Sequence, residues 1–123
     1  MIGLGLDLCE IKRIERTMEK NDSFLTRYYT DEERSYIAAK GKMGAASAAA
    51  MFAAKEAFLK AVGLGLGGGI PLCDIGVSHD EHGAPRYDLR GAAALKLAEL
   101  SANTAMLSLT HEAGIAGAVC IIE

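Results

Sequence analysis

The chain has 123 residues, of which half are hydrophobic and 24% are charged, and its formal net charge is −3. This composition is typical of one globular domain with a substantial core, and it excludes a disordered chain. It also argues against nucleic acid as the main partner, because proteins that follow a phosphate backbone are usually strongly basic. No apolar stretch approaches the roughly 20 residues that cross a bilayer.

The N-terminal segment has no basic flank and meets a charge at Asp7, which does not fit a signal peptide. The three cysteines, Cys9, Cys73 and Cys120, are widely spaced and form no C-x-x-C pair. This count and spacing predict neither a disulfide framework nor a thiolate zinc site. We therefore expect a reduced, cytoplasmic protein.

Residues 1–8 alternate strictly, with apolar side chains on one face and Gly3, Gly5 and Asp7 on the other, which predicts a β-strand. A glycine face indicates that another backbone or a ligand approaches closely. If the alanine-rich segment described next packs there, Asp7 lies near Glu56. Two such carboxylates suit Mg²⁺, which takes one or two carboxylates together with water and phosphate oxygens. For Asp7 alone, a helix N-cap or a strand end is the alternative.

Residues 44–62 are rich in alanine and contain no proline, which predicts a long helix that Gly63 ends in a left-handed cap. The helix is apolar nearly all round, as expected of a buried helix. Glu56 and Lys60 nevertheless stand one turn apart on one face. Charges in such a helix are costly unless they are paired or used by a ligand. A plain ion pair between these two residues is the alternative to a functional site.

Residues 10–21 predict a short amphipathic helix with a basic stripe formed by Arg13, Arg16 and Lys20. The stripe is either a solvated helix face, since glutamates are interleaved with it, or a dock for an acidic partner. Thr30 and Glu33 form a capping box that starts another helix, ending near residue 39.

The segment 63–69 contains five glycines. It lacks the Lys-Ser/Thr pair of a P-loop, so it indicates a loop close to a ligand more than a phosphate cradle. His79 and His82 flank a turn at a spacing that fits a metal, but exposed turn histidines are commoner. The C-terminal half predicts a strand at 72–78, a turn at 80–84, a strand at 86–89, a helix at 91–100 and strands at 105–110 and 115–122 around a turn at 112–114.

Several segments, in this order, resemble the holo-[acyl-carrier-protein] synthases, the short trimeric type of 4′-phosphopantetheinyl transferase. They are GLGLD at 3–7, EIKRI at 10–14, FAAKEAFLKA at 52–61 with GLG at 63–65, the turn ending in Gly-Ala-Pro at 83–85, and SLTH at 108–111. The resemblance covers nearly the whole chain. It implies an α+β fold of the 4′-phosphopantetheinyl transferase type, one domain over residues 1–123, with a small antiparallel sheet packed on a long central helix.

The resemblance also implies an activity. It is the Mg²⁺-dependent transfer of 4′-phosphopantetheine from coenzyme A to a serine of apo acyl carrier protein, for fatty acid synthesis. Adenosine 3′,5′-bisphosphate is the other product. The implied assembly is a homotrimer that holds coenzyme A between subunits.

Residue roles follow from the same resemblance. Asp7 and Glu56 would bind the metal, Glu56 would accept the serine proton, directly or through a metal-bound water, and Lys60 would neutralise or protonate the departing phosphate. The remaining roles fall into two sets: Lys60, Gly63, Leu64, Gly65, Pro85, Thr110 and His111 would contact coenzyme A, and Arg13, Arg16, Met18, Phe24, Leu25 and Arg27 would contact the carrier protein. The chain departs from the family pattern at Met51, where many members have arginine, and at Glu112, where threonine often follows the histidine.

Two rival functions remain open at this point. One is a different Mg²⁺-dependent enzyme of phosphate esters, such as a small hydrolase or nucleotidyl transferase, that uses the same two carboxylates. The other is a non-catalytic trimeric module that docks an acidic protein. The first leaves the basic helix without a use, and the second leaves Glu56 and Lys60 unexplained.

Overall fold

The computed structural model describes residues 1–65 and 68–123. The elements are β1 (Gly3–Glu10), α1 (Ile11–Lys20), α2 (Phe24–Tyr28), α3 (Asp31–Ala39), a 3₁₀ turn (Gly41–Met43), α4 (Gly44–Ala61), a second 3₁₀ turn (Leu72–Asp74), β2 (Ile75–His79), β3 (Pro85–Leu89), α5 (Gly91–Glu99), β4 (Ala105–Glu112) and β5 (Ile115–Ile122).

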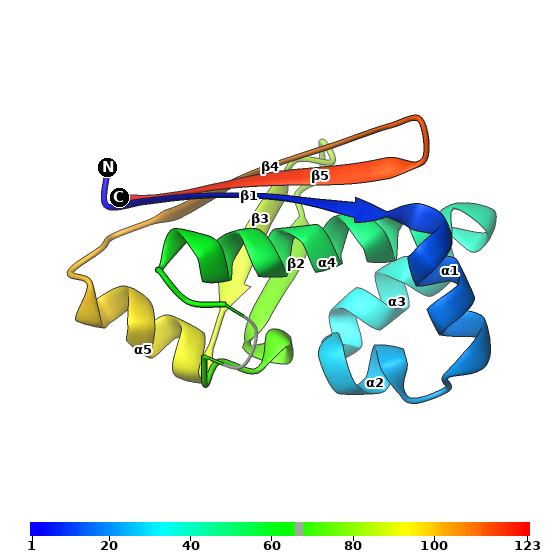
Figure 1. The fold of residues 1–123 in the computed structure, drawn as a ribbon, viewed down its shortest axis with the longest axis horizontal. Coiled ribbons are helices and arrows are strands. Elements are labelled where there is room, and N and C mark those ends of the chain that lie inside the picture. The colour runs from blue at the N-terminus through cyan, green and yellow to red at the C-terminus, as the bar shows by residue number, and fades with distance from the viewer. Residues whose placement is uncertain (66–67) are drawn as a thin grey trace.

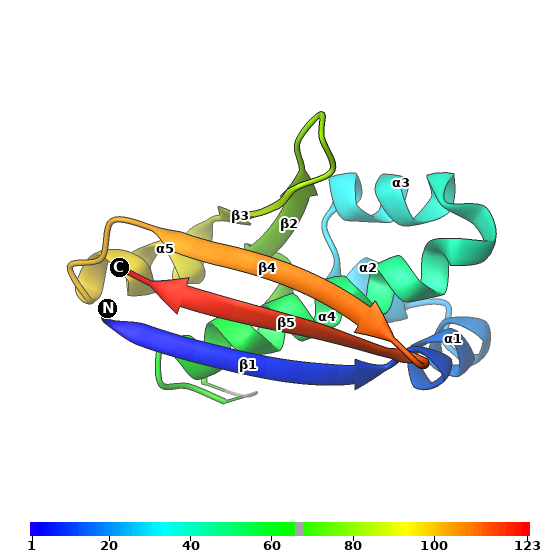
Figure 2. The ribbon, with the colours of Figure 1, turned by 90° about the horizontal axis from the view of Figure 1, so that it is seen from above.

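The central helix α4 packs against two sheets (Figures 1 and 2). A three-stranded antiparallel sheet, in the order β1-β5-β4, covers one side of it, and the hairpin β2–β3 flanks it next to β4. Helices α1, α2 and α3 gather at one end of the molecule and α5 at the other (Figure 1). Both termini lie at the α5 end (Figure 2). The expected α+β arrangement, a small antiparallel sheet on a long central helix, is confirmed.

Helix α4 matches its prediction closely. It is buried almost all round and ends at Ala61, and Gly63, two residues later, has a φ of 83°, the left-handed conformation expected there. Two hydrogen bonds close this end: the Gly63 amide donates to the Lys60 carbonyl at 3.0 Å, and the Leu64 amide donates to the Leu59 carbonyl at 2.7 Å. They form a Schellman motif, which turns Leu64 back toward the helix. No helix in the described ranges 1–65 and 68–123 is both long and apolar enough to cross a membrane.

The glycine face of β1 packs directly on α4. A Cβ at Gly5 would overlap the carbonyl oxygen of Ala57, and a Cβ at Gly3 would overlap that of Ala61. Only glycine allows strand and helix backbones to approach this closely. The predicted packing is therefore confirmed, and it places Asp7, the next inward position of β1, over the same helix.

Some boundaries differ from prediction for local reasons. β1 covers residues 3–10 instead of 1–8, because its ladder with β5 continues to the pair Glu10–Ile115. Residues 72–74, predicted as strand, form a 3₁₀ turn, since the Asp74 amide donates to the Pro71 carbonyl at 3.0 Å. The short helix α2 was not predicted. The capping box of Thr30 and Glu33 is present as expected.

Candidate functional site

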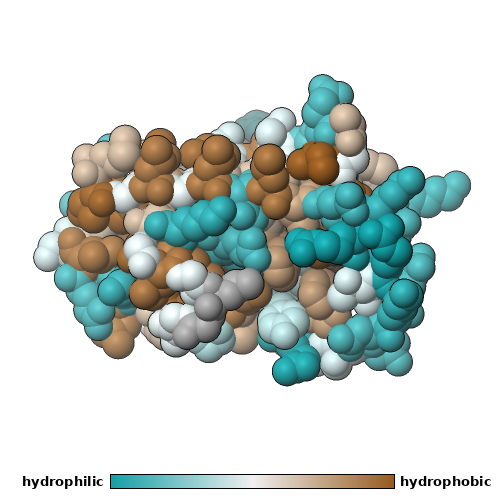
Figure 3. All heavy atoms as spheres, in the orientation of Figure 1, coloured by the Kyte–Doolittle hydropathy of each residue, from teal (hydrophilic) through white to brown (hydrophobic). Residues whose placement is uncertain are grey.

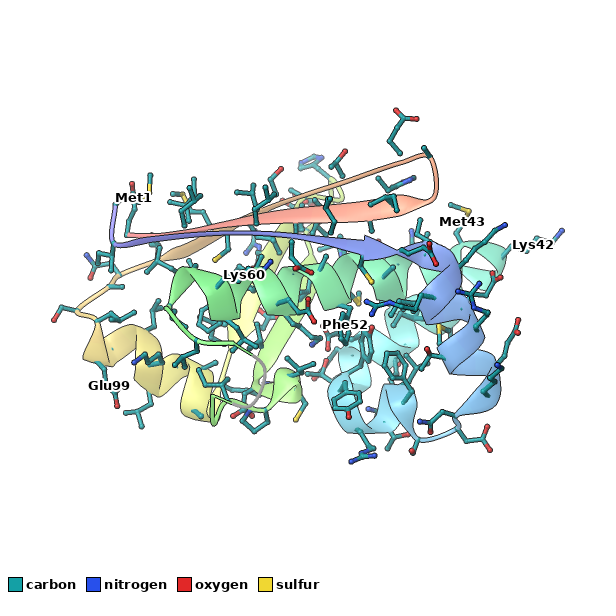
Figure 4. All side chains as sticks on the ribbon, viewed as in Figure 1. Met1, Lys42, Met43, Phe52, Lys60 and Glu99 are labelled. Carbon is teal, nitrogen blue, oxygen red and sulfur yellow. The ribbon has the colours of Figure 1, made fainter. Side chains whose placement is uncertain are left out.

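Asp7, Glu56 and Lys60 come together where β1 lies along α4. Asp7 is held inward by the alternation of β1, and its side chain is 9% exposed. The ammonium of Lys60 donates to Asp7 Oδ1 at 2.8 Å and to the Leu6 carbonyl at 3.0 Å. Figure 4 labels Lys60 on α4 below β1. The ion pair of this cluster therefore joins Lys60 to Asp7, and the alternative of a plain Glu56–Lys60 pair is wrong.

Glu56 is a half-buried carboxyl in an unusual electrostatic setting. Partial burial raises its pKa to about 7, and the side chain and negative charge of Asp7 act in the same direction. Arg13 and Lys60 oppose this shift. A carboxyl with a pKa near neutrality suits a general base that works near pH 7.

Asp7 also meets a specific requirement for a metal site. Its second oxygen, Oδ2, is buried and has no hydrogen-bond partner among the described residues. A buried carboxylate oxygen without a donor is costly unless a cation approaches it. The described ranges contain no cluster of three or more His, Cys, Asp or Glu side chains that suits a metal. Two carboxylates, with positions left for water and phosphate oxygens, fit Mg²⁺ better than a cation that needs a full protein cage.

These side chains line a cavity of about 300 Å³, which we call the carboxylate cavity. Leu64 and Gly65 close it, because the Schellman motif folds them back over the end of α4. The other expected coenzyme residue of this loop, Gly63, is exposed and provides the turn instead of the lining. The rest of the predicted 63–69 loop includes residues 66 and 67, which lie outside the described residues.

The remaining residues expected at coenzyme A line a different cavity, of about 410 Å³, which we call the hairpin cavity. Pro85, Thr110 and His111 lie there together with Met51, whose side chain is buried. Thr110 belongs to β4, and Asp7 belongs to β1. These strands are the two edges of the three-stranded sheet, so one chain holds the two halves of the expected site apart.

The histidines of the predicted turn do not form a metal site in the structure. His79 lines the hairpin cavity and stacks on Tyr36 with ring centroids 4.2 Å apart. His82 is exposed at the tip. Glu112, the second departure from the family pattern, is exposed at the end of β4 and does not line the hairpin cavity.

The basic surface predicted on α1 is exposed, with one correction. Arg13, Arg16 and Arg27 are exposed, and Met18 is half-buried beside them. Phe24 is 6% exposed and packs against Tyr28, Tyr29 and Phe52 of the core. Its aromatic ring belongs to the interior because α2 turns it toward α4, so we remove Phe24 from the expected docking surface.

One charged group on α4 was not predicted as a notable residue from the sequence. Lys55, next to Glu56, is fully buried and forms an ion pair at 2.8 Å with Glu33, which is also fully buried. The signal was available in the sequence, because Lys55 stands in the same apolar helix as Glu56 and Lys60. Lys55 lies on the face of α4 that is turned away from the three-stranded sheet. Its partner Glu33 could not be identified from the sequence, because only the packing of α3 and β2 brings the two side chains together.

Known proteins resemble this chain over its whole length. Residues 3–120 match the family model of the 4′-phosphopantetheinyl transferase superfamily. The holo-[acyl-carrier-protein] synthase of Treponema denticola is 44% identical over 123 residues, which cover 100% of this chain and 98% of that protein. The protein of the same name from Syntrophus aciditrophicus is also 44% identical, with 98% and 94% covered.

Solved structures agree. The holo-[acyl-carrier-protein] synthase of Neisseria meningitidis superposes with a TM-score of 0.87 at 36% identity, covering 100% of this chain and 99% of that one. The Helicobacter pylori enzyme in complex with coenzyme A gives a TM-score of 0.82 at 30% identity, covering 98% and 99%. Together with the family model, these matches show that the chain belongs to the holo-[acyl-carrier-protein] synthases of the 4′-phosphopantetheinyl transferase superfamily.

Proposed function

We propose that this protein transfers 4′-phosphopantetheine from coenzyme A to a serine hydroxyl of apo acyl carrier protein in the presence of Mg²⁺. Adenosine 3′,5′-bisphosphate is released, and the holo carrier protein serves fatty acid synthesis in the cytoplasm. The observation that carries the proposal is the carboxylate cavity, where Asp7, Glu56 and Lys60 meet. Family membership and the relative solved with coenzyme A support the choice of donor.

Asp7 and Glu56 would hold the metal ion, as suggested by Asp7 Oδ2, which is buried without a hydrogen-bond partner in the part of the chain that the structure describes. When bound, Mg²⁺ neutralises charge on the pyrophosphate of coenzyme A. Glu56 would take the proton of the serine hydroxyl as its oxygen attacks the β-phosphorus. The bond from that phosphorus to the bridging oxygen breaks, and the electron pair leaves with adenosine 3′,5′-bisphosphate. Lys60 lies beside Asp7 and offsets the charge that develops on this leaving phosphate.

The complete site would require more than one copy of the chain. One argument is the separation of the carboxylate and hairpin cavities at opposite edges of the sheet. The other is the outer face of β1, where Leu4, Leu6 and Leu8 are each more than half exposed. Figure 3 shows this apolar surface as a row of brown side chains along the sheet. A contiguous apolar face indicates a protein interface, and a homotrimer would cover it and bring the β1 edge of one copy to the β4 edge of the next.

The acyl carrier protein would dock on α1 and the neighbouring α2. Arg13, Arg16 and Arg27 supply exposed positive charge on an otherwise acidic protein, and Met18 supplies apolar contact. Figure 3 shows hydrophilic side chains concentrated at this end of the molecule. Such a surface steers an acidic partner and sets its orientation.

Intact mass spectrometry tests the proposal. An apo acyl carrier protein is incubated with this protein, coenzyme A and Mg²⁺, with a chelator in a parallel sample. We expect a mass gain of one phosphopantetheine group that disappears with the chelator, because the transfer requires the metal. A reaction that consumes coenzyme A without carrier protein would instead favour the hydrolase, and no reaction with several carrier proteins would overturn the proposal.

A further inference from the structure

The Glu33–Lys55 ion pair has no part in the chemistry proposed above, yet it is the most deeply buried charged pair that the structure describes. Both side chains are completely inaccessible. Removing two charges from water is expensive, and an apolar pair of similar volume often serves stability equally well. The location of this pair in the fold therefore requires a reason beyond stability.

Lys55 is fully satisfied by hydrogen bonds. Its ammonium donates to Glu33 Oε1 at 2.8 Å, to the Leu72 carbonyl at 3.1 Å and to the Ile75 carbonyl at 2.9 Å. An ammonium has three donors, and each one has an acceptor here. Lys55 thus ties α4 to α3 and to the segment that leads into β2.

Glu33 is satisfied in the same way. Oε1 accepts from Lys55 and from the Thr30 amide at 2.8 Å, and Oε2 accepts from the Val77 amide at 3.0 Å. Val77 lies in the middle of β2, which pairs with β3. One carboxylate therefore fixes the first turn of α3 against both the hairpin and the central helix.

The elements joined at this ion pair are those that wall the hairpin cavity. Helix α3 carries Tyr36 one turn after Glu33, and α4 carries Met51 one turn before Lys55. The hairpin carries His79 and Pro85, which pair with each other across β2 and β3. The His79 ring stacks on the Tyr36 ring with an interplanar angle of 6°. Helix α3, helix α4 and the hairpin therefore each contribute one residue to the buried hydrogen-bond network. A few residues away in sequence, each contributes another residue to the wall of the hairpin cavity.

We propose that the Glu33–Lys55 ion pair is a positioning device that sets the spacing of the hairpin cavity and thereby the affinity for coenzyme A. This inference rests on the proposed function and on the expectation that Pro85, Thr110 and His111, which line that cavity, contact coenzyme A. Neither residue is catalytic, since neither reaches the cavity surface. Their effect passes through α3, α4 and β2, whose relative placement the ion pair fixes.

The test uses Glu33→Gln and Lys55→Met in the full-length protein. Each is assayed for KM and kcat with coenzyme A, for equilibrium binding of coenzyme A, and for Mg²⁺ affinity, at a temperature where circular dichroism shows it folded. We expect the KM for coenzyme A and its dissociation constant to rise roughly tenfold, because displaced walls lose aligned contacts. The kcat at saturation and the Mg²⁺ affinity stay near the wild-type values, since the carboxylate cavity lies at the other edge of the sheet.

Two matched controls separate positioning from loss of stability. Ile122→Ala removes a buried side chain of β5 far from the hairpin cavity, and it lowers the melting temperature while leaving the network intact. Glu32→Gln removes the neighbouring charge at an exposed position. Both are expected to keep the wild-type KM for coenzyme A.

The inference is overturned if folded Glu33→Gln keeps the wild-type KM, or if Ile122→Ala raises KM as much. If Lys55→Met does not fold, the KM of Glu33→Gln for coenzyme A alone decides whether the ion pair positions the walls of the hairpin cavity. Absence of transfer by the wild-type protein, assayed in parallel, overturns the proposed function instead and the inference with it.

Discussion

The two ion pairs of α4 differ in how completely they are enclosed. Glu33–Lys55 is sealed from solvent, and the hydrogen-bonding atoms of both side chains have partners. Asp7–Lys60 joins a buried carboxylate to an ammonium whose side chain is 54% exposed, and one Asp7 oxygen has no partner in the described part of the chain. Glu56, half-buried next to this pair, has a pKa of about 7.

This difference distinguishes a structural pair from a chemical one. A sealed network rigidifies the elements that it joins, because breaking it exposes charges to a medium that cannot solvate them. An open cluster with an unsatisfied oxygen and a raised pKa retains capacity to bind and to exchange a proton. The same helix thus uses its face toward β2 for support, and its face toward β1 carries the groups proposed to react.

The largest effect is expected at the open cluster. Asp7→Ala and Glu56→Ala each remove a proposed metal ligand, and Glu56→Ala also removes the proposed base. We expect the rate of phosphopantetheine transfer to fall by roughly 10³-fold or more, because positioned acid–base and metal chemistry together contribute at least this much. The melting temperature of each variant, measured by calorimetry, should fall little. Full activity in either variant contradicts the assignment.

Lys60→Met tests the difference between the open Asp7–Lys60 pair and the sealed Glu33–Lys55 pair. Lys60→Met leaves the buried Asp7 carboxylate without its ion-pair partner, but this pair borders the carboxylate cavity and the Lys60 side chain is 54% exposed, so the melting temperature should fall less than in Lys55→Met, which should lower it by roughly 10 °C or more. For kcat the order reverses: Lys60→Met should reduce it roughly 10²-fold, in line with loss of one charge-stabilising donor. Thermal denaturation and steady-state kinetics on both variants provide the measurement. Equal melting temperatures for the two would remove the distinction between sealed and open pairs.

The open cluster was predictable from the sequence because its geometry follows from local patterns. The alternation of residues 1–8 and the uninterrupted alanine run each specify an element, and the glycines at 3 and 5 specify how the two meet. The close approach of strand and helix backbones then brings Asp7 over the face of α4 that carries Glu56 and Lys60.

The sealed pair and the second cavity were not predictable in this way. Glu33 appears in sequence as a capping residue, and its second role depends on Val77 and Lys55, which lie 44 and 22 residues away. Such contacts follow from tertiary packing, and no periodicity encodes them. Phe24 was misassigned for the same reason, since its burial depends on how α2 packs against α4.

The basic surface extends the comparison to the second substrate. Arg13→Glu reverses an exposed charge of α1, and we expect it to raise the KM for acyl carrier protein roughly tenfold through lost charge complementarity. The KM for coenzyme A should stay unchanged, which is the opposite of the result expected for Glu33→Gln. Steady-state kinetics with each substrate varied in turn provides the measurement. An equal rise in both constants would show that α1 is misplaced as the docking surface.

The smallest effect concerns Glu56 and stability in the absence of metal. Its pKa is about 7 in the folded protein and near 4.5 when unfolded, so the unfolded state releases this proton first as the pH rises. The stability that protonated Glu56 contributes is therefore present below about pH 4.5 and lost by about pH 7. Because the side chain is only half-buried, solvent screening reduces this loss to about 1–2 kcal/mol.

The Glu56→Gln variant has no ionisable side chain at position 56. Its free energy of unfolding should therefore not fall between about pH 4.5 and pH 7 as that of the wild-type protein does. Urea denaturation of both proteins in chelator, at pH 5 and pH 8, measures the difference. The free energies of unfolding of the two proteins should be similar at pH 5, and that of the variant should be the larger at pH 8. Saturating Mg²⁺ should restore the stability of the wild-type protein at pH 8 but not that of the variant, because only the wild-type protein retains both carboxylates. A ligand stabilises the folded state when it binds that state. Parallel pH dependence in the two proteins would contradict the raised pKa and place Glu56 with the sealed, structural charges.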